Sequence, residues 1–244
     1  MQSHSRRSKG RQIDSPGKKQ KISFPKAWRI HLSGNRCEKL KRAFKKRGGI
    51  APGSIPLSQI GFDFDGVIAD TAQTFVAIAA KRYGYKSLST EDITDFELEG
   101  CVAIPRETVE RIFTEILHDS LGAEVLPMPS AIQTLSDFAA RQQITVITAR
   151  PLEQPVRDWL AHYLEPAIIH RFTVIATGDH DDKSRYIHEQ GIEFFVDDRA
   201  ATCLSLVEEG ITPIVFRQPW NEGRHTFTTV DNWQEIATLV NLQG

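Results

Sequence analysis

The sequence has few cysteines and no long apolar run. Its three cysteines, Cys37, Cys101 and Cys203, lie far apart in 244 residues, which argues against a disulfide framework and a zinc knuckle. No apolar stretch approaches the roughly 18 residues that a membrane-spanning helix needs. The sequence therefore predicts a protein of a reducing compartment, and we expect it in the cytoplasm and not in a membrane.

Basic charge is unevenly distributed, although the net charge is only −1. Residues 1–50 contain 16 lysines and arginines but only two acidic residues, so residues 51–244 carry an excess of 15 negative charges. The first 21 residues have almost no apolar side chains, and folding them would cost conformational entropy without compensating burial. We expect residues 1–57 to form a basic, largely disordered extension and linker.

The role of this extension stays open at the level of the sequence. It lacks the apolar core of a secretory signal peptide, but its acid-poor composition is compatible with an organelle transit peptide. Translation from a non-methionine start after residue 50 would still leave a complete domain. The basic residues could also bind nucleic acid through its phosphates, although only three aromatic side chains there are available for stacking on bases.

From residue 58 onward, short apolar runs alternate with helical patterns. The runs are rich in β-branched and aromatic residues, as in parallel strands whose two faces are covered by helices. This alternation predicts an α/β fold with a Rossmann-like parallel sheet flanked by helices, over residues 58–84 and 129–244. The expected strands are residues 60–64, 144–148, 173–176, 193–196 and 213–216.

Helical periodicity and end signals place several helices of this core. Residues 131–141 put apolar side chains on one face, and residues 200–209 end before Gly210. The last expected helix, residues 233–240, follows Asp231 at capping-box spacing.

One segment interrupts the alternation of strands and helices. It follows the expected helix at residues 71–83 and the stop signal Gly84. Residues 85–128 read as helical pieces, notably residues 105–117, with no convincing strand. We expect residues 85–128 to form a small helical cap inserted after the first strand and helix.

The clearest functional pattern is an apolar strand that ends in two acidic residues. Asp63 and Asp65 lie two residues apart, which places both carboxylates on one face of the strand. Two carboxylates this close favour a bound cation, and Mg²⁺ prefers oxygen ligands. Gly66 follows, where the missing side chain allows a close approach or a positive φ. A lone Asp-x-Asp-Gly sequence is more commonly a surface turn, so the pattern alone does not define a site.

Later segments add polar groups near the ends of other expected strands. Ligands of open α/β sheets bind at the carboxyl ends of the strands, so these groups together favour a binding site there. Taken singly, each has a structural explanation as a helix cap or a solvated charge. The groups are Thr148 and Arg150 after one strand, Lys183 in the first turn of a helix, and Asp197, Asp198 and Arg199 after another strand.

This set of motifs resembles that of the haloacid dehalogenase-like (HAD) phosphohydrolase superfamily. The Asp-x-Asp-Gly-Val strand, the strand ending in threonine, the lysine and the strand ending in two aspartates occur in order within residues 58–244. The segment Ile-Thr-Ala-Arg-Pro at 147–151, the turn Gln-Pro-Trp-Asn at 218–221 and the short insertion resemble the 5′(3′)-deoxyribonucleotidase-like branch.

The resemblance implies a role for each acidic residue. It implies that Asp63 attacks phosphorus to form an aspartyl phosphate. Asp65 would protonate the leaving oxygen and then take a proton from the attacking water. Mg²⁺ would be held by Asp63, the backbone carbonyl of Asp65 and one or both of Asp197 and Asp198.

The basic and hydroxyl residues would bind the substrate in this scheme. The resemblance implies that Thr148 and Lys183 bind the transferring phosphoryl oxygens, and Lys183 would also keep Asp63 ionised. Arg150 and Arg199 are candidate substrate contacts, with bracing of the acids and surface ion pairing as the alternatives.

The sequence thus predicts a Mg²⁺-dependent phosphomonoesterase that resembles a 5′-nucleotidase acting on nucleoside monophosphates. A phosphatase for another small phosphate ester is the first alternative, because the cap selects the substrate and contains no unambiguous base contact. A nucleic-acid-associated protein that binds through residues 1–50 is the second. Four aromatic residues near the expected cap are candidates for stacking on a base or for simple packing: Tyr83, Tyr85, Phe96 and Phe113.

Overall fold

The computed structural model of the protein describes residues 49–179 and 182–242. The predictions for residues 1–48 lie outside these described residues. Residues 55–57, which the sequence assigned to the linker, belong to the fold: β1 (Ile55–Pro56) pairs with β8 (Val240–Asn241), and both Ile55 and Leu57 are buried. No helix within the described residues is long and apolar enough to cross a membrane.

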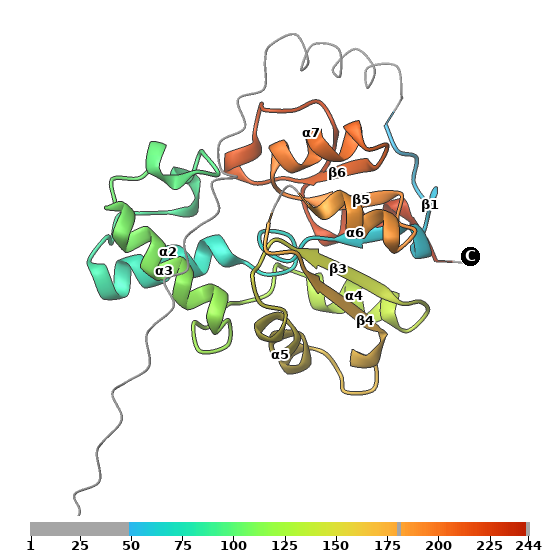
Figure 1. The fold of residues 1–244 in the computed structure, drawn as a ribbon, viewed down its shortest axis with the longest axis horizontal. Coiled ribbons are helices and arrows are strands. Elements are labelled where there is room, and N and C mark those ends of the chain that lie inside the picture. The colour runs from blue at the N-terminus through green and yellow to red at the C-terminus, as the bar shows by residue number, and fades with distance from the viewer. Residues whose placement is uncertain (1–48, 180–181, 243–244) are drawn as a thin grey trace, which may run out of the picture.

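A six-stranded parallel sheet forms the centre of the molecule and confirms the predicted α/β fold (Figure 1). Its strand order is β4-β3-β2-β5-β6-β7, and every neighbouring pair is parallel. The first of these strands in the chain, β2, lies between β3 and β5, so its carboxyl end meets theirs. The strands are β2 (Ile60–Phe62), β3 (Ile144–Thr148), β4 (Phe172–Ala176), β5 (Phe194–Asp197), β6 (Thr212–Phe216) and β7 (Thr228–Val230).

Helices cover both faces of the sheet. On one face, Phe62 packs against Phe138 of α4 and Trp233 of α8, with ring centres 6.3 and 5.2 Å apart. On the other face, Ile187 of α6 and Leu206 of α7 belong to a separate buried cluster. The helices are α2 (Thr71–Tyr83), α3 (Arg106–His118), α4 (Ala131–Ala139), α5 (Gln154–Tyr163), α6 (Lys183–Glu189), α7 (Ala200–Glu208) and α8 (Trp233–Leu239), with 3-10 turns η2 (Leu57–Gln59), η3 (Thr90–Asp92), η4 (Leu98–Gly100), η5 (Ile169–Arg171) and η6 (Pro219–Asn221).

Several expected element ends differ from the structure, and two of these differences have a clear physical cause. The strand predicted at 60–64 ends at Phe62, because the chain then turns so that the N–H groups of Ile68 and Ala69 both donate to the carbonyl of Phe64. The last helix is capped by Asn232 and not by Asp231: the Asn232 side chain accepts from the N–H of Glu235. The Asp231 carboxylate pairs with Arg217 instead.

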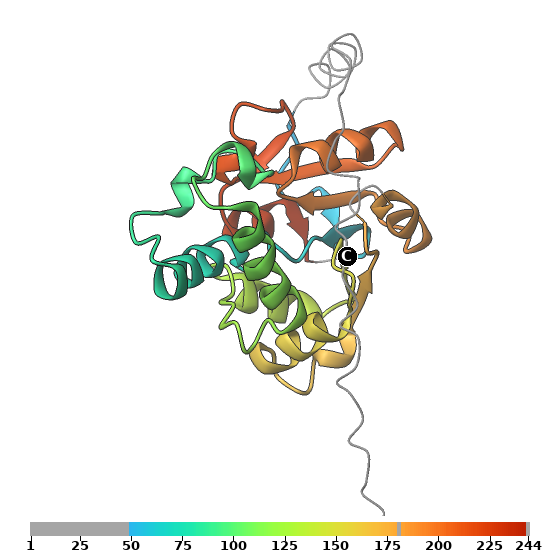
Figure 2. The same cartoon turned by 60° about the vertical axis from the view of Figure 1, so that its left-hand side comes forward.

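The inserted segment, residues 85–128, lies to one side of the sheet in both views (Figures 1 and 2). It contains η3, η4 and α3, and α3 packs along α2. Its return to the core runs beside the loop that precedes α2, where the N–H of Asp70 donates to Leu126 and that of Met128 donates to Ile68. The segment also contacts loops that follow the strand ends, through the pairs Ser120–Arg150, Phe96–Arg199 and Asp95–Arg224.

Candidate active site

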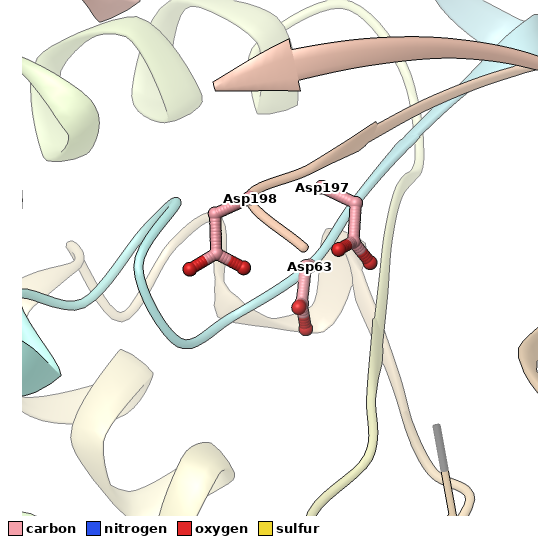
Figure 3. A group of neighbouring side chains, drawn as sticks. All are labelled: Asp63, Asp197 and Asp198. Carbon is pink, nitrogen blue, oxygen red and sulfur yellow. The ribbon is translucent and has the colours of Figure 1, made fainter. Parts of the chain in front are cut away.

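Three buried carboxylates meet at the carboxyl ends of β2 and β5. Asp63 follows β2, Asp197 is the last residue of β5, and Asp198 comes next. One carboxylate oxygen from each lies within 4.8 Å of the others, and the groups face a common space in Figure 3. Strand pairing of β2 with β5 produces this arrangement, because Phe62 is in register with Val196. We call Asp63, Asp197 and Asp198 the carboxylate cluster.

Lys183 supplies the positive charge that contacts this cluster. Its Nζ lies 2.7 Å from Oδ2 of Asp63 and 2.7 Å from Oδ2 of Asp197, and its side chain is buried. The residue begins α6, as the sequence predicted. The second oxygen of Asp197 accepts from the backbone N–H of Arg199 at 2.8 Å. Asp197 is therefore held by the protein on both oxygens.

The charge of the carboxylate cluster exceeds what Lys183 can neutralise. Burial raises the pKa of Asp63 to about 7, although Lys183 opposes the rise. Burial and the neighbouring Asp197 and Asp63 raise the pKa of Asp198 well above its usual value. For Lys183, burial would lower the pKa, but Asp197 and Asp63 outweigh burial and raise it. Lys183 thus stays charged and pairs with Asp63 as expected, but its effect on the pKa of Asp63 is smaller than that of burial.

Asp198 is positioned by the turn at η6 and by Gly66. Trp220 Nε1 donates to Asp198 Oδ2 at 3.0 Å, and Asn221 Nδ2 donates to the Asp198 carbonyl at 2.8 Å. Gly66 has a φ of +72°, and a Cβ there would lie 2.1 Å from Asp198 Oδ2. The positive φ expected from the sequence therefore occurs at this glycine, and the group that approaches it closely is the Asp198 carboxylate.

Asp65 forms a separate ion pair with Arg150. Arg150 Nε donates to Asp65 Oδ2 at 2.8 Å, and Arg150 Nη2 donates to Oδ1 at 2.7 Å. The arginine side chain is 1% exposed and the aspartate side chain 29% exposed. Thr71, the first residue of α2, also donates to Oδ1. We call this unit the Asp65–Arg150 pair.

The pKa of Asp65 in this pair shifts in the opposite direction to the pKa values of Asp63 and Asp198 in the carboxylate cluster. Burial would raise the pKa of Asp65, but the charge and hydrogen bonds of Arg150 and the hydrogen bond from Thr71 outweigh burial and lower it. A bidentate guanidinium–carboxylate contact is among the stronger charge-assisted hydrogen bonds. In the free protein, Asp65 is therefore a carboxylate whose charge is balanced locally.

The two remaining candidates lie on either side of these groups. Thr148 ends β3, two residues beyond the residue that pairs with Phe62, and its buried hydroxyl accepts from the N–H of Arg150 at 3.3 Å. The Arg199 guanidinium lies over the ring of Phe96, 4.9 Å from its centre. Its Nη1 is buried and has no hydrogen-bond partner among the described residues.

The carboxylate cluster fits a hard divalent cation. If all three carboxylates were ionised, one lysine would leave two uncompensated negative charges in a buried site, and such charges are costly unless they are paired or bind metal. Carboxylate oxygens are the ligands that Mg²⁺ prefers. Burial and the neighbouring carboxylates raise the pKa of Asp198, and a bound cation would act in the opposite direction by favouring its ionised form.

Sequence reasoning missed several groups that position the acids. The sequence places Trp220 in the turn at 218–221 without giving it a role, yet its indole N–H donates to Asp198. Thr71 looked only like the start of a helix, although its hydroxyl reaches Asp65. Ser120 gave no sequence signal, because its contact with Arg150 depends on how the inserted segment returns to the core.

A comparison with protein-family models shows which family, and therefore which class of enzyme, the chain belongs to. The family model described as "5' nucleotidase, deoxy (Pyrimidine), cytosolic type C protein" matches residues 57–243. The chain belongs to this family. This nucleotidase-family protein is thus a phosphomonoester hydrolase of the HAD superfamily, as the motifs predicted. No curated protein matches the chain.

Solved structures show the same fold at low sequence identity. A HAD family hydrolase from Deinococcus radiodurans R1, solved with bound phosphate and sodium, has a TM-score of 0.52 and 15% identity, and the match covers 78% of this chain and 98% of that one. A haloacid dehalogenase-like hydrolase from Streptococcus pneumoniae has a TM-score of 0.51 and 14% identity, covering 72% and 95%. A putative haloacid dehalogenase-like hydrolase from Bacteroides fragilis has a TM-score of 0.51 and 13% identity, covering 72% and 98%.

Proposed function

We propose that this protein is a Mg²⁺-dependent 5′-nucleotidase-like enzyme that hydrolyses nucleoside monophosphates through an aspartyl phosphate on Asp63. The observation that carries the proposal is the buried carboxylate cluster, which has Lys183 within 2.7 Å of two of its members. Free thiols at Cys101 and Cys203 support a location in the reducing cytoplasm.

The proposed metal ligands are Asp63, Asp198 and the backbone carbonyl of Asp65. Asp198 is our candidate among the two paired acids, because within the described residues its carboxylate accepts only from Trp220, whereas Asp197 accepts on both oxygens. When bound, Mg²⁺ would neutralise charge on the cluster and on a phosphate oxygen. Repulsion between a carboxylate and a phosphate dianion amounts to several kcal/mol, roughly, at about 4 Å and an effective dielectric near 20.

In the first step, a carboxylate oxygen of Asp63 attacks phosphorus in line with the leaving oxygen. The new bond joins Asp63 to phosphorus, the bond from phosphorus to the leaving oxygen breaks, and that oxygen takes a proton from Asp65. Lys183 and the Thr148 hydroxyl bind the phosphoryl oxygens and stabilise the charge that develops on them.

In the second step, water attacks the phosphorus of the aspartyl phosphate. Asp65, now a carboxylate, accepts a proton from the water as the new bond forms. The bond between phosphorus and Asp63 breaks, which releases inorganic phosphate and restores the Asp63 carboxylate. Asp65 ends the cycle with the proton that it needs for the next leaving group.

We propose that the inserted segment, residues 85–128, serves as the cap that selects the leaving group. Its Phe96 covers Arg199. Because no described residue accepts from Nη1 of that arginine, Arg199 is our candidate for a substrate contact. The ring of Phe113 stacks on Phe75 at 5.1 Å, which favours packing for this aromatic residue. Tyr83 and Tyr85 also pack against the core while staying half-buried.

A phosphate-release screen tests the proposal. The full-length protein is assayed with deoxy- and ribonucleoside monophosphates and with sugar phosphates, in Mg²⁺ and in EDTA. We expect turnover of nucleoside monophosphates only with Mg²⁺, and we expect Asp63→Asn to lower it at least about a thousandfold, because the nucleophile is lost. Asp137→Asn is the matched control, since it removes an exposed carboxylate on α4.

The screen also separates the alternatives. Turnover confined to sugar phosphates would favour a phosphatase for another small ester. A protein that hydrolyses no monoester but binds polynucleotides at low salt would favour a nucleic-acid-associated role, because phosphate contacts by lysines and arginines weaken steeply with salt. Full activity of Asp63→Asn would show that another residue attacks phosphorus.

A further inference from the structure

Arg150 connects the proposed acid and base to the inserted segment. Two of its three guanidinium nitrogens bind Asp65, and the third, Nη1, donates to Ser120 Oγ at 2.5 Å. The same Nη1 makes a longer contact of 3.5 Å with the carbonyl of Ile116, in the last turn of α3. One buried side chain therefore spans the core and the end of the inserted helix.

The position of Arg150 is fixed by its surroundings. Its guanidinium lies 4.8 Å from the centre of the Phe64 ring, and Phe64 packs edge-on against Trp159 of α5 at 5.0 Å. Trp159 Nε1 in turn donates to the carbonyl of Val125, in the segment that returns from α3 to the core. Arg150 is thus enclosed by Phe64, by α5 and by the segment that returns from α3. Loss of its carboxylate partner would leave a buried guanidinium unpaired, which is strongly destabilising.

The end of α3 needs such a partner. The last carbonyls of a helix have no partner within the helix, and cations near a helix C-terminus interact favourably with its dipole. Ser120 Oγ donates to the carbonyl of Ile116 at 3.1 Å and accepts from Arg150. Arg150 and Ser120 together therefore terminate α3, and Arg150 simultaneously orients the Asp65 carboxylate.

The donors also determine which Asp65 oxygen remains available. Oδ1 accepts from both Thr71 and Arg150 Nη2, so both of its lone pairs are used. Within the described part of the chain, Oδ2 accepts only from Arg150 Nε, which leaves one acceptor position. A proton exchanged with the leaving oxygen or with water is thus directed to Oδ2.

We propose that Arg150 is a positioning residue that ties the Asp65 carboxylate to the C-terminal end of α3, so that proton transfer by Asp65 depends on where that helix end lies. This inference rests on the proposed function, in which Asp65 protonates the leaving oxygen. It places Arg150 outside the group of substrate contacts, because each guanidinium nitrogen already binds protein. The inserted segment would then influence the chemical step as well as substrate selection.

The test compares two leaving groups. A nucleoside 5′-monophosphate releases an alkoxide that needs a proton, whereas p-nitrophenyl phosphate releases a stable phenolate that does not. With Mg²⁺ and the full chain, we compare kcat/KM, which covers only the first step and leaves out the water attack that is common to both substrates. We expect Arg150→Met to lower kcat/KM for the nucleotide at least about tenfold more than kcat/KM for p-nitrophenyl phosphate. Ser120→Ala should shift the ratio in the same direction by roughly two- to fivefold.

Arg82→Met is the matched control. Arg82 also holds α3 to the core, through an ion pair with Glu115, but it does not contact Asp65. We expect Arg82→Met to change both kcat/KM values by the same factor. Thermal melting of each variant measures any loss of stability, which should not alter the ratio of the two kcat/KM values.

Specific outcomes would overturn the inference. Equal losses on both substrates in Arg150→Met would make Arg150 merely structural, and a rise in KM alone would make it a substrate contact. If Arg150→Met does not fold, an unchanged ratio in Ser120→Ala overturns the inference. If the wild-type protein hydrolyses neither substrate, the proposed function itself is wrong, and that result is distinct from equal losses in an active enzyme.

Discussion

The carboxylate cluster and the Asp65–Arg150 pair each contain one aspartate from the segment that follows β2, but the protein balances their charges differently. Asp63 and its two companions share one lysine, and all are buried. Asp65, two residues later, has an arginine of its own and keeps part of its side chain exposed. Arg150 therefore neutralises the charge of Asp65, whereas Lys183 can neutralise only one of the three carboxylates in the cluster.

The two aspartates consequently have pKa values shifted in opposite directions. Burial raises that of Asp63 to about 7, whereas Arg150 and Thr71 outweigh burial and lower that of Asp65. A nucleophile needs the ionised form and a general acid needs the protonated form, so the free protein favours the reverse of the catalytic assignment. A cation at the cluster would favour the ionised form of Asp63. A dianionic substrate beside Asp65 would favour the protonated form of Asp65.

Removing one negative charge from the cluster should produce the largest change in metal response. We expect Asp198→Asn to require at least about tenfold more Mg²⁺ for half-maximal activity, because a charged ligand becomes neutral. In EDTA the same variant should melt at a higher temperature than the wild type, since a buried repulsion is removed.

Melting curves with and without Mg²⁺ check both effects. Asp231→Asn is the control, because this carboxylate lies in an exposed ion pair with Arg217. A variant that kept the Mg²⁺ response of the wild type would place the ion elsewhere. Lower stability of Asp198→Asn in EDTA would show that the cluster is already balanced without metal.

The pH dependence of stability should separate the cluster from the pair. Asp63 has a raised pKa in the folded protein, so its contribution is fully present below about 3.8, the unfolded value, and is lost as the pH rises to about 7. Without metal, the free energy of unfolding from this group should therefore fall between pH 5 and 7.5. Asp65 has a lowered pKa, so its contribution is present above the unfolded value and is lost only on acidification.

Urea unfolding in EDTA at several pH values measures this difference. The loss between pH 5 and 7.5 should be smaller in Asp63→Asn and should disappear in the wild type when Mg²⁺ is saturating, because the ion binds the deprotonated form. An equal slope in Asp63→Asn and the wild type would assign the pH dependence to other groups.

The smallest expected effect concerns the indole that holds Asp198. Trp220→Phe keeps an aromatic ring but removes the N–H that donates to Asp198 Oδ2. We expect the Mg²⁺ concentration for half-maximal activity to rise roughly two- to tenfold, the value of one hydrogen bond. Trp233→Phe removes a similar buried donor, which binds the Val67 carbonyl, and should lower stability without changing the Mg²⁺ response.

Much of this core was predictable because local signals and tertiary packing agree. The strand at residues 144–148 is buried at every position, and the helix at residues 71–83 ends at a glycine with positive φ, so both match the prediction. Asp231 and Asn232 are both good cap residues, and the distant Arg217 decides between them. Short β7 has too few residues to give a pattern.

The candidate site was predictable where its residues end strands, and less so where contacts cross the chain. Asp63 and Asp197 follow apolar runs, so their positions could be inferred from strand alternation. The partner of Arg150 could not, because nothing local distinguishes a bidentate contact with Asp65 from contact with a substrate or a surface acid. That choice depends on how the inserted segment encloses the arginine.

The position of β2 between β3 and β5 has a consequence for synthesis of the protein. One edge of β2 pairs with β5, whose residues leave the ribosome more than 130 residues later. Until then that edge offers unpaired N–H and C=O groups, which invite association with other chains. The entropy cost of closing a loop grows only slowly with its length, so the segment between β2 and β5 can change in size with little effect on stability. The nascent chain, however, has to remain soluble until β5 has been synthesised.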